Sequence, residues 1–241
     1  RVVYQRITNT IRMYAKQRRL SAMVADQVSQ KEKRSQMMIG ILSRVVERRN
    51  GESRTHVQHI STLTGMLLDH LVQKTETYPL TQEMRRTISM ASVLHDIGKM
   101  EIGEQVLNSP EPRTPEDEEI MRQHTLLGAR MLEELDAYRD EDFVRVAYQI
   151  CRWHHERYDG SGYPDQLVGE QIPIAAQVVG LADAYETLTT GSGSQPPVPC
   201  AAAVQMLCTG EAGAFNPVLL DCLREIENEI DDAMRRRPET L

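Results

Sequence analysis

The sequence predicts an all-α protein, and three observations support this prediction. Apolar residues recur at spacings of three or four along most of the chain, which is the period of an amphipathic helix. No segment of useful length alternates apolar and polar residues as a half-buried strand does. Proline and glycine gather at residues 109–115, 159–173 and 191–199, which reads as three loops between helices.

The first predicted helix is long and amphipathic. Residues 3–43 contain no proline and one glycine, and their apolar residues form a stripe at helical spacing, with a break near residues 16–19 as one interpretation: Ile7, Ile11, Tyr14, Leu20, Val24 and Val28. We interpret residues 1–45 as a linker helix that pairs with its copy in a homodimer. Because the chain starts at Arg1 and enters this helix at once, we expect it to be cut from a longer protein.

The remaining residues, 46–241, are expected to form one helical bundle domain, since no internal repeat or long low-complexity stretch interrupts them. Period and composition predict helices over residues 35–48, 53–74, 82–96, 115–135, 140–154, 172–190, 199–209 and 216–235.

Composition excludes several classes of protein. The 241 residues are 40% hydrophobic and 26% charged, which suits a folded core rather than disorder. Only 5% are aromatic, which disfavours stacking on single-stranded nucleic acid. No apolar run approaches the roughly 20 residues that span a membrane, and no signal segment opens the chain. We therefore expect a soluble, cytoplasmic protein without a membrane partner, with its four cysteines reduced.

Charge is divided unevenly along the chain. Residues 1–50 carry 12 Lys and Arg against 3 Asp and Glu, whereas the rest carries 16 against 32. The basic front could contact nucleic acid, but no base-reading motif accompanies it, so we favour a solvated helix face and expect no nucleic acid partner. An acidic body repels anionic substrates, so phosphate chemistry there needs cations inside the site, which points to metal ions.

Two adjacent pairs of possible metal ligands stand out: His95-Asp96 in VLHDIGK and His154-His155 in WHHERYDGSGYP. Neighbouring helical residues point about 100° apart, so such pairs can contact two sides of a metal cluster. Imidazole and carboxylate suit iron, manganese or zinc, and two metals can orient a phosphate for in-line displacement. The pattern predicts hydrolysis of a phosphate ester. His70, standing alone, is interpreted as a core or surface residue.

Five segments, in this order, resemble the HD-GYP domain of the HD metal-dependent phosphohydrolase superfamily. They are HDIGK at 95–99, MRQHTLLGARML around His124, HHERYDGSGYP at 154–164, GEQIP at 169–173 and ADAYETLTT at 182–190. The resemblance covers residues 46–230 and implies a helical HD-type bundle around a central metal site.

The resemblance also implies residue roles. Lys99 contacts the substrate phosphate and acts with Asp96 in catalysis, and Gly162, Tyr163 and Pro164 line the substrate. Glu52 either holds a third metal or is a first-turn carboxylate favoured by the helix dipole. His59 is kept out of the ligand set. The implied metal ligands are Glu52, His56, His95, Asp96 as a bridge, His124, His154, His155 and Asp183.

The activity that the resemblance implies is a metal-dependent cyclic di-GMP phosphodiesterase that forms pGpG and then GMP. Two or three divalent ions are expected, iron first and manganese second. Gln177 and the segment 191–199 stand where the family commonly has arginines. The alternatives are therefore the same chemistry on another cyclic dinucleotide or nucleotide, or a weakly active nucleotide-sensing adaptor.

The N-terminal RVVYQRITNTIRMYAKQRRL also resembles the linker helix after the receiver domain of response regulators. This resemblance implies an upstream receiver domain in a two-component system. A diguanylate cyclase is a further expected partner.

Overall fold

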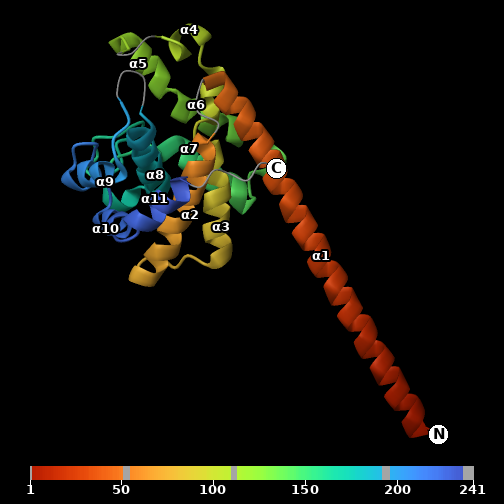
Figure 1. The fold of residues 1–241 in the computed structure, drawn as a ribbon. Coiled ribbons are helices and arrows are strands. Elements are labelled where there is room, and N and C mark those ends of the chain that lie inside the picture. Colours follow the sequence, from red (N-terminus) through yellow and green to blue (C-terminus); the bar gives the residue numbers. More distant parts are fainter. Residues whose placement is uncertain (1, 51–54, 110–112, 192–195, 236–241) are drawn as a thin grey trace. The chain divides into compact units, whose positions relative to one another are not determined.

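The computed structural model describes residues 2–50, 55–109, 113–191 and 196–235, which divide into two compact units, residues 1–42 and 43–241. None of the described residues forms a strand, and a single isolated bridge joins Asp159 to Val168. The all-α prediction is confirmed (Figure 1). The functional division at residues 45 and 46 stays a prediction.

The N-terminal helix α1 (Val2–Asn50) is continuous, so the interpretation with a break near residues 16–19 was wrong. No proline or glycine lies there to interrupt the backbone hydrogen bonds. Of the predicted apolar stripe, Tyr14, Leu20 and Val24 are exposed in the single chain, with 72%, 61% and 54% of their surface accessible.

The second unit is a bundle of mostly short helices (Figure 1). α2 packs on α3 and α8, and α7 packs on α3, α6 and α8. These five are α2 (His56–Lys74), α3 (Gln82–Ala91), α6 (His124–Glu133), α7 (Asp142–Trp153) and α8 (Ile174–Thr190). The others are α4 (Glu104–Leu107), α5 (Pro115–Arg122), α9 (Cys200–Thr209), α10 (Pro217–Glu225) and α11 (Glu227–Arg235). The described residues of this unit also form the 3-10 turns η1 (Ser92–Leu94), η2 (Ile97–Glu101), η3 (Asp136–Tyr138) and η4 (Gly169–Gln171).

Two long predicted helices are each divided in two. The helix expected over 115–135 breaks at Gln123 between α5 and α6, and the one over 216–235 breaks at Ile226 between α10 and α11. The starts of α5 and α10 are capped: Thr114 accepts from the amide of Asp117 and Asn216 from that of Val218, each before a proline.

The helix predicted over 82–96 ends early, at Ala91, and continues as the 3-10 turns η1 and η2 with His95 and Asp96 in the bend between them. Close backbone packing explains this path. A Cβ on Gly98 would lie 1.9 Å from the carbonyl oxygen of His124, so only glycine lets η2 lie against α6. The chain thereby bends at its two predicted ligands.

The core of the bundle surrounds α8, most of whose residues are buried. Its side chains pack against the apolar face of α2, which buries Ile60, Leu63, Leu67 and Leu71. A Cβ on Gly180 of α8 would lie 2.3 Å from the carbonyl oxygen of His154, so this glycine sets how closely α8 approaches the end of α7. No helix among the described residues combines the length and apolar character that a membrane span requires.

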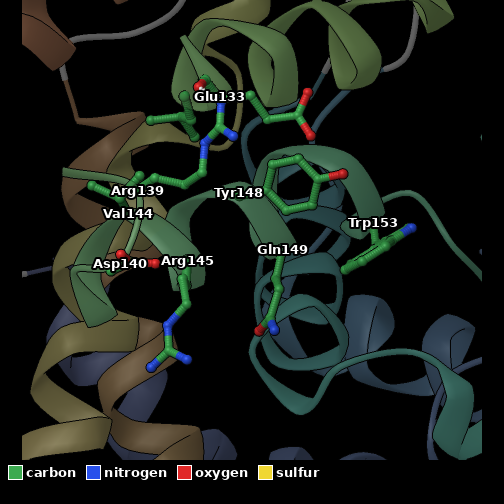
Figure 2. Close-up of a pocket in the computed structure, with 9 residues that line it drawn as sticks. Glu133, Arg139, Asp140, Val144, Arg145, Tyr148, Gln149 and Trp153 are labelled. Atoms are coloured by element: carbon green, nitrogen blue, oxygen red, sulfur yellow. Dashed lines mark hydrogen bonds between the residues drawn. The ribbon is translucent and has the colours of Figure 1, made fainter. Parts of the chain in front are cut away.

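A cavity of about 350 Å³ lies along α7, beside the end of α6 (Figure 2). Tyr148 and Trp153 line it together with charged residues. Its arginines are engaged within the fold, since Arg139 donates to the carbonyl of Glu133 and Arg145 pairs with Asp142. None of the predicted site residues lines this cavity.

Substituting Gly180→Ala is expected to lower the free energy of unfolding by about 1–3 kcal/mol, because the added methyl group pushes α8 away from His154. Urea unfolding followed by circular dichroism measures this. Gly103→Ala is the matched control, since a Cβ there meets nothing within 4 Å. Equal stability of the two variants would contradict the close packing at Gly180.

Candidate metal centre

The centre is built around the buried carboxylate of Asp96. On one side, Oδ1 lies 3.2 Å from Nε2 of His124 and 3.8 Å from Nε2 of His154. On the other side, Oδ2 lies 3.3 Å from Nε2 of His95 and 2.6 Å from Nζ of Lys99. The bend between η1 and η2 thus brings Asp96 to the ends of α6 and α7, where it joins two groups of candidate metal ligands.

Those two groups adjoin each other. Within each, every residue offers one ligand atom, and these atoms all lie within 4.8 Å of one another. His95 of the second group is also 3.9 Å from Asp183 Oδ1 of α8. The first group is Asp96, His124, His154 and His155, and the second is His56, His95 and Asp183.

Four of the histidines are held in the same way, through Nδ1. Because a carbonyl or an ionised carboxylate can only accept, Nδ1 carries the proton in each, and Nε2 is left with the lone pair that a metal needs. The pairs are His56 with Glu186 Oε2 at 2.7 Å, His95 with Ser92 O at 2.9 Å, His124 with Met121 O at 2.7 Å and His154 with Ile150 O at 2.9 Å.

The residues fit a metal. Nε2 of His95 and Oδ1 of Asp96 are buried atoms that make no hydrogen bond of acceptable geometry among the described residues. Buried polar atoms without partners are costly in a folded protein unless a ligand satisfies them. The donor set of imidazole nitrogens and carboxylates is one that divalent transition metals favour.

Electrostatics keep these groups in the forms that bind a metal. Burial opposes the charge on Asp96, but Lys99 and His95 hold the pKa of this carboxyl well below its usual range. Burial lowers the pKa of His124, and it lowers those of His154 and His155 further, so these imidazoles are neutral near pH 7. His95 is the exception, because the Asp96 charge outweighs burial and raises its pKa.

Glu186 belongs to the centre, although the sequence analysis did not single it out. It is 3% exposed and accepts from Nδ1 of His56, with Nδ1 of His59 at 3.4 Å. Burial works against ionisation, but the hydrogen bonds from His56 and His59 lower the pKa of Glu186 to about 2. A signal was present: Glu186 follows Asp183 by three residues, on the same face of α8.

The loop after α7 brings Tyr163 beside the centre. Its ring stacks on that of His155, with centroids 4.8 Å apart and planes 20° apart. The guanidinium carbon of Arg122 lies over the same ring, 5.0 Å from its centroid. The Tyr163 ring therefore contacts both His155 and Arg122.

Gly162 and Pro164 shape the backbone of the loop after α7. A Cβ on Gly162 would lie 2.3 Å from the backbone nitrogen of Arg157, so this glycine serves close packing within the loop. Pro164 follows Tyr163 through a cis peptide bond. Glu156, buried next to the histidine pair, accepts hydrogen bonds from the backbone amides of Asp165 and Leu167. These bonds fix the part of the loop that follows Pro164.

Other predicted positions lie elsewhere. Glu52 and residues 192–195 lie outside the described residues. Gln177 is buried and uses both ends of its amide inside the fold, donating to the carbonyl of Ile172 and accepting from Asn216. His70, expected in the core or on the surface, is partly exposed and hydrogen-bonds Glu225.

Comparisons agree with this geometry. The chain is 33% identical over 192 residues to the cyclic di-GMP phosphodiesterase response regulator RpfG of Xanthomonas campestris, covering 80% of this chain and 48% of that protein. It is 30% identical over 191 residues to 3'3'-cGAMP-specific phosphodiesterase 2 of Vibrio cholerae, covering 79% of this chain and 34% of that protein. The chain thus spans about half or less of these relatives.

The fold has a solved counterpart in an HDG"Y"P protein from Bdellovibrio bacteriovorus, with a TM-score of 0.53 and 23% identity over 73% of this chain and 54% of that one. The family model described as HD domain matches residues 18–217. This match covers most of the chain and includes every residue of the two ligand groups. The chain belongs to the HD domain family.

Proposed function

We propose that the chain is a metal-dependent phosphodiesterase that hydrolyses cyclic di-GMP to pGpG, with GMP as the product of a second hydrolysis. The observation that carries this proposal is the convergence of buried imidazole nitrogens and two carboxylates beside the ammonium group of Lys99. The names of the relatives, which are phosphodiesterases of cyclic dinucleotides, support the same reaction class.

The proposed ligands are the two groups around Asp96, together with Glu52 for a third ion. Two or three divalent ions are proposed, iron first and manganese second, because a mixed imidazole and carboxylate set suits both. When bound, such ions stabilise the charge that develops on a phosphodiester and lower the pKa of water. Asp96, between the groups, is the proposed bridge.

The chain's own residues would bind and orient the substrate. Lys99 has its Nζ 2.6 Å from Asp96, which puts a positive charge next to the proposed position of the scissile phosphate. Burial raises the pKa of the Tyr163 phenol, so its hydroxyl keeps its proton and can donate a hydrogen bond to an anionic oxygen. These two side chains come from separate elements and approach the centre from η2 and from the loop after α7.

A second candidate substrate is a cyclic GMP-AMP dinucleotide, favoured by the similarity to the cGAMP-specific enzyme. The Gln177 side chain makes its hydrogen bonds inside the fold and supplies no positive charge to a substrate phosphate. This difference from the arginine common in the family favours a substrate other than cyclic di-GMP. The third candidate, a sensing adaptor, predicts tight binding of metal and nucleotide without product. A panel of cyclic and linear dinucleotides separates the three.

Proposed partners follow from the N-terminal helix. Its exposed apolar residues favour a second copy of this chain, because exposed apolar surface at helical spacing is typical of helix pairing. An upstream receiver domain and a diguanylate cyclase are further proposed partners, as the sequence resemblance implies.

Asp96→Ala is expected to remove most bound metal and to abolish hydrolysis, because it deletes the proposed bridge. The measurement combines cyclic di-GMP turnover with iron and manganese content, on protein purified without oxygen. Asp140→Ala removes an exposed carboxylate in the turn before α7; it is the control and should match the unmodified protein. Full activity of Asp96→Ala would contradict the mechanism.

Glu186→Gln is expected to weaken metal binding by about 10–100-fold, because the amide loses the charge that fixes Nδ1 of His56. Competition with a metal-binding dye measures the affinity without any turnover. Glu225→Gln is a matched control, since Glu225 also accepts from a histidine, His70, but on the surface. Unchanged affinity in Glu186→Gln would show that the carboxylate does not orient the ligand.

Leu20→Glu combined with Val24→Glu is expected to convert a dimer into a monomer, since each charge would be placed in the paired helix face. Sedimentation equilibrium of the full chain measures the mass. Gln17→Glu, at an exposed polar position of the same helix, should leave the dimer intact. A monomeric unmodified chain at high concentration would contradict pairing through α1.

A further inference from the structure

A cyclic dinucleotide carries two phosphodiester groups, and only one of them can be at the metals during a given hydrolysis. The other is equally anionic and needs a partner, because the surrounding body is acidic. Lys99 is engaged with Asp96 at the centre, and Gln177 offers no charge. The question is which residues meet the second phosphate.

Arg157 is a cation in an unusual position. It follows the His154-His155-Glu156 run and is only partly accessible, with its guanidinium carbon 4.8 Å from the centroid of the Phe215 ring. Of its five possible N–H donors, one donates to the carbonyl oxygen of Glu156, at 3.2 Å. No carboxylate of the described residues forms an ion pair with it.

The surroundings of Arg157 connect it to the centre. Burial lowers its pKa, and the nearby carboxylate of Asp183 is the strongest of the effects that raise it. An arginine stays charged throughout the range in which proteins fold. Burying a charged guanidinium with a single hydrogen bond costs free energy, so binding of an anionic ligand would stabilise it.

A second guanidinium, that of Arg122, lies over the ring of Tyr163. Arg122, at the end of α5, has its guanidinium over the Tyr163 ring, and its side chain is 47% exposed. Its nearest carboxylate is that of Glu118, with Nε and Oε1 separated by 3.7 Å, which is a weak surface pair. The Tyr163 hydroxyl makes no hydrogen bond among the described residues. Burial raises its pKa, and the charge of Arg157 opposes that rise.

We propose that Arg157, the hydroxyl of Tyr163 and Arg122 form an anion subsite that takes the non-scissile phosphodiester of the cyclic dinucleotide. The subsite deepens, and rests on, the proposed phosphodiesterase function. Arg157 is its fixed part, stacked on Phe215, and Arg122 is the adjustable part at the solvent side. Guanidinium groups suit this role because they give paired hydrogen bonds to phosphate oxygens.

The test compares cyclic di-GMP with guanylyl-guanosine, GpG, which has the same bases but a single phosphodiester. The readouts are the KM for cyclic di-GMP and the inhibition constant of GpG on the metal-loaded enzyme. Arg157→Gln is expected to raise the KM about tenfold or more and to change the GpG constant far less. Arg122→Gln should do the same to a smaller extent.

Three variants control the test. Arg157→Lys keeps the charge and should recover part of the lost affinity, which a purely structural role would not explain. Arg157→Met keeps the packing on Phe215 but should behave like Arg157→Gln, and its melting temperature reports on folding. Arg130→Gln, an exposed arginine of α6, should match the unmodified enzyme.

Equal losses for cyclic di-GMP and GpG, or no loss for either, would overturn the subsite. If the unmodified protein hydrolyses no cyclic dinucleotide, the proposed function fails by itself. Calorimetric titration of the loaded protein with cyclic di-GMP then decides the subsite. Binding weakened about tenfold by Arg157→Gln supports it, whereas absent or unaffected binding overturns it.

Discussion

The rest of the structure depends on keeping one ionised carboxylate, that of Asp96, buried among imidazoles. Taking such a charge out of water costs several kcal/mol even after relaxation, so it must be compensated by nearby groups. Lys99 and His95 supply this compensation in the protein itself. The short turns η1 and η2 and the close contact at Gly98 exist where they do because Asp96 must reach α6 and α7 together.

The imidazoles around this carboxylate are oriented by two different means. His95, His124 and His154 donate to carbonyls three or four residues earlier in their own segments, so their orientation is local. His56 instead donates to Glu186, which is 130 residues away. His95, His124 and His154 are therefore oriented by their own backbone, whereas His56 needs α2 and α8 to be correctly packed.

Much of the candidate site could be predicted because its proposed ligands occur as adjacent pairs in recognisable segments. His95-Asp96 and His154-His155 are visible in any linear reading, and the structure brings them together. Helix lengths were harder, since the early end of α3 depends on the contact between Gly98 and the backbone of His124, which no local pattern encodes. The sequence shows that Gln177 stands where the family commonly has arginine, but its bonds to Ile172 and Asn216 become visible only in the folded chain.

The only tryptophan of the chain lies where the loop meets the centre. Trp153 directly precedes His154, and its indole nitrogen donates to Asp165, the residue after Pro164, at 2.7 Å. The same indole lines the cavity along α7 (Figure 2). Because this chain has no other indole, the fluorescence of Trp153 reports without a label on the conformation of this loop. It also reports on the binding of a molecule in the adjacent cavity.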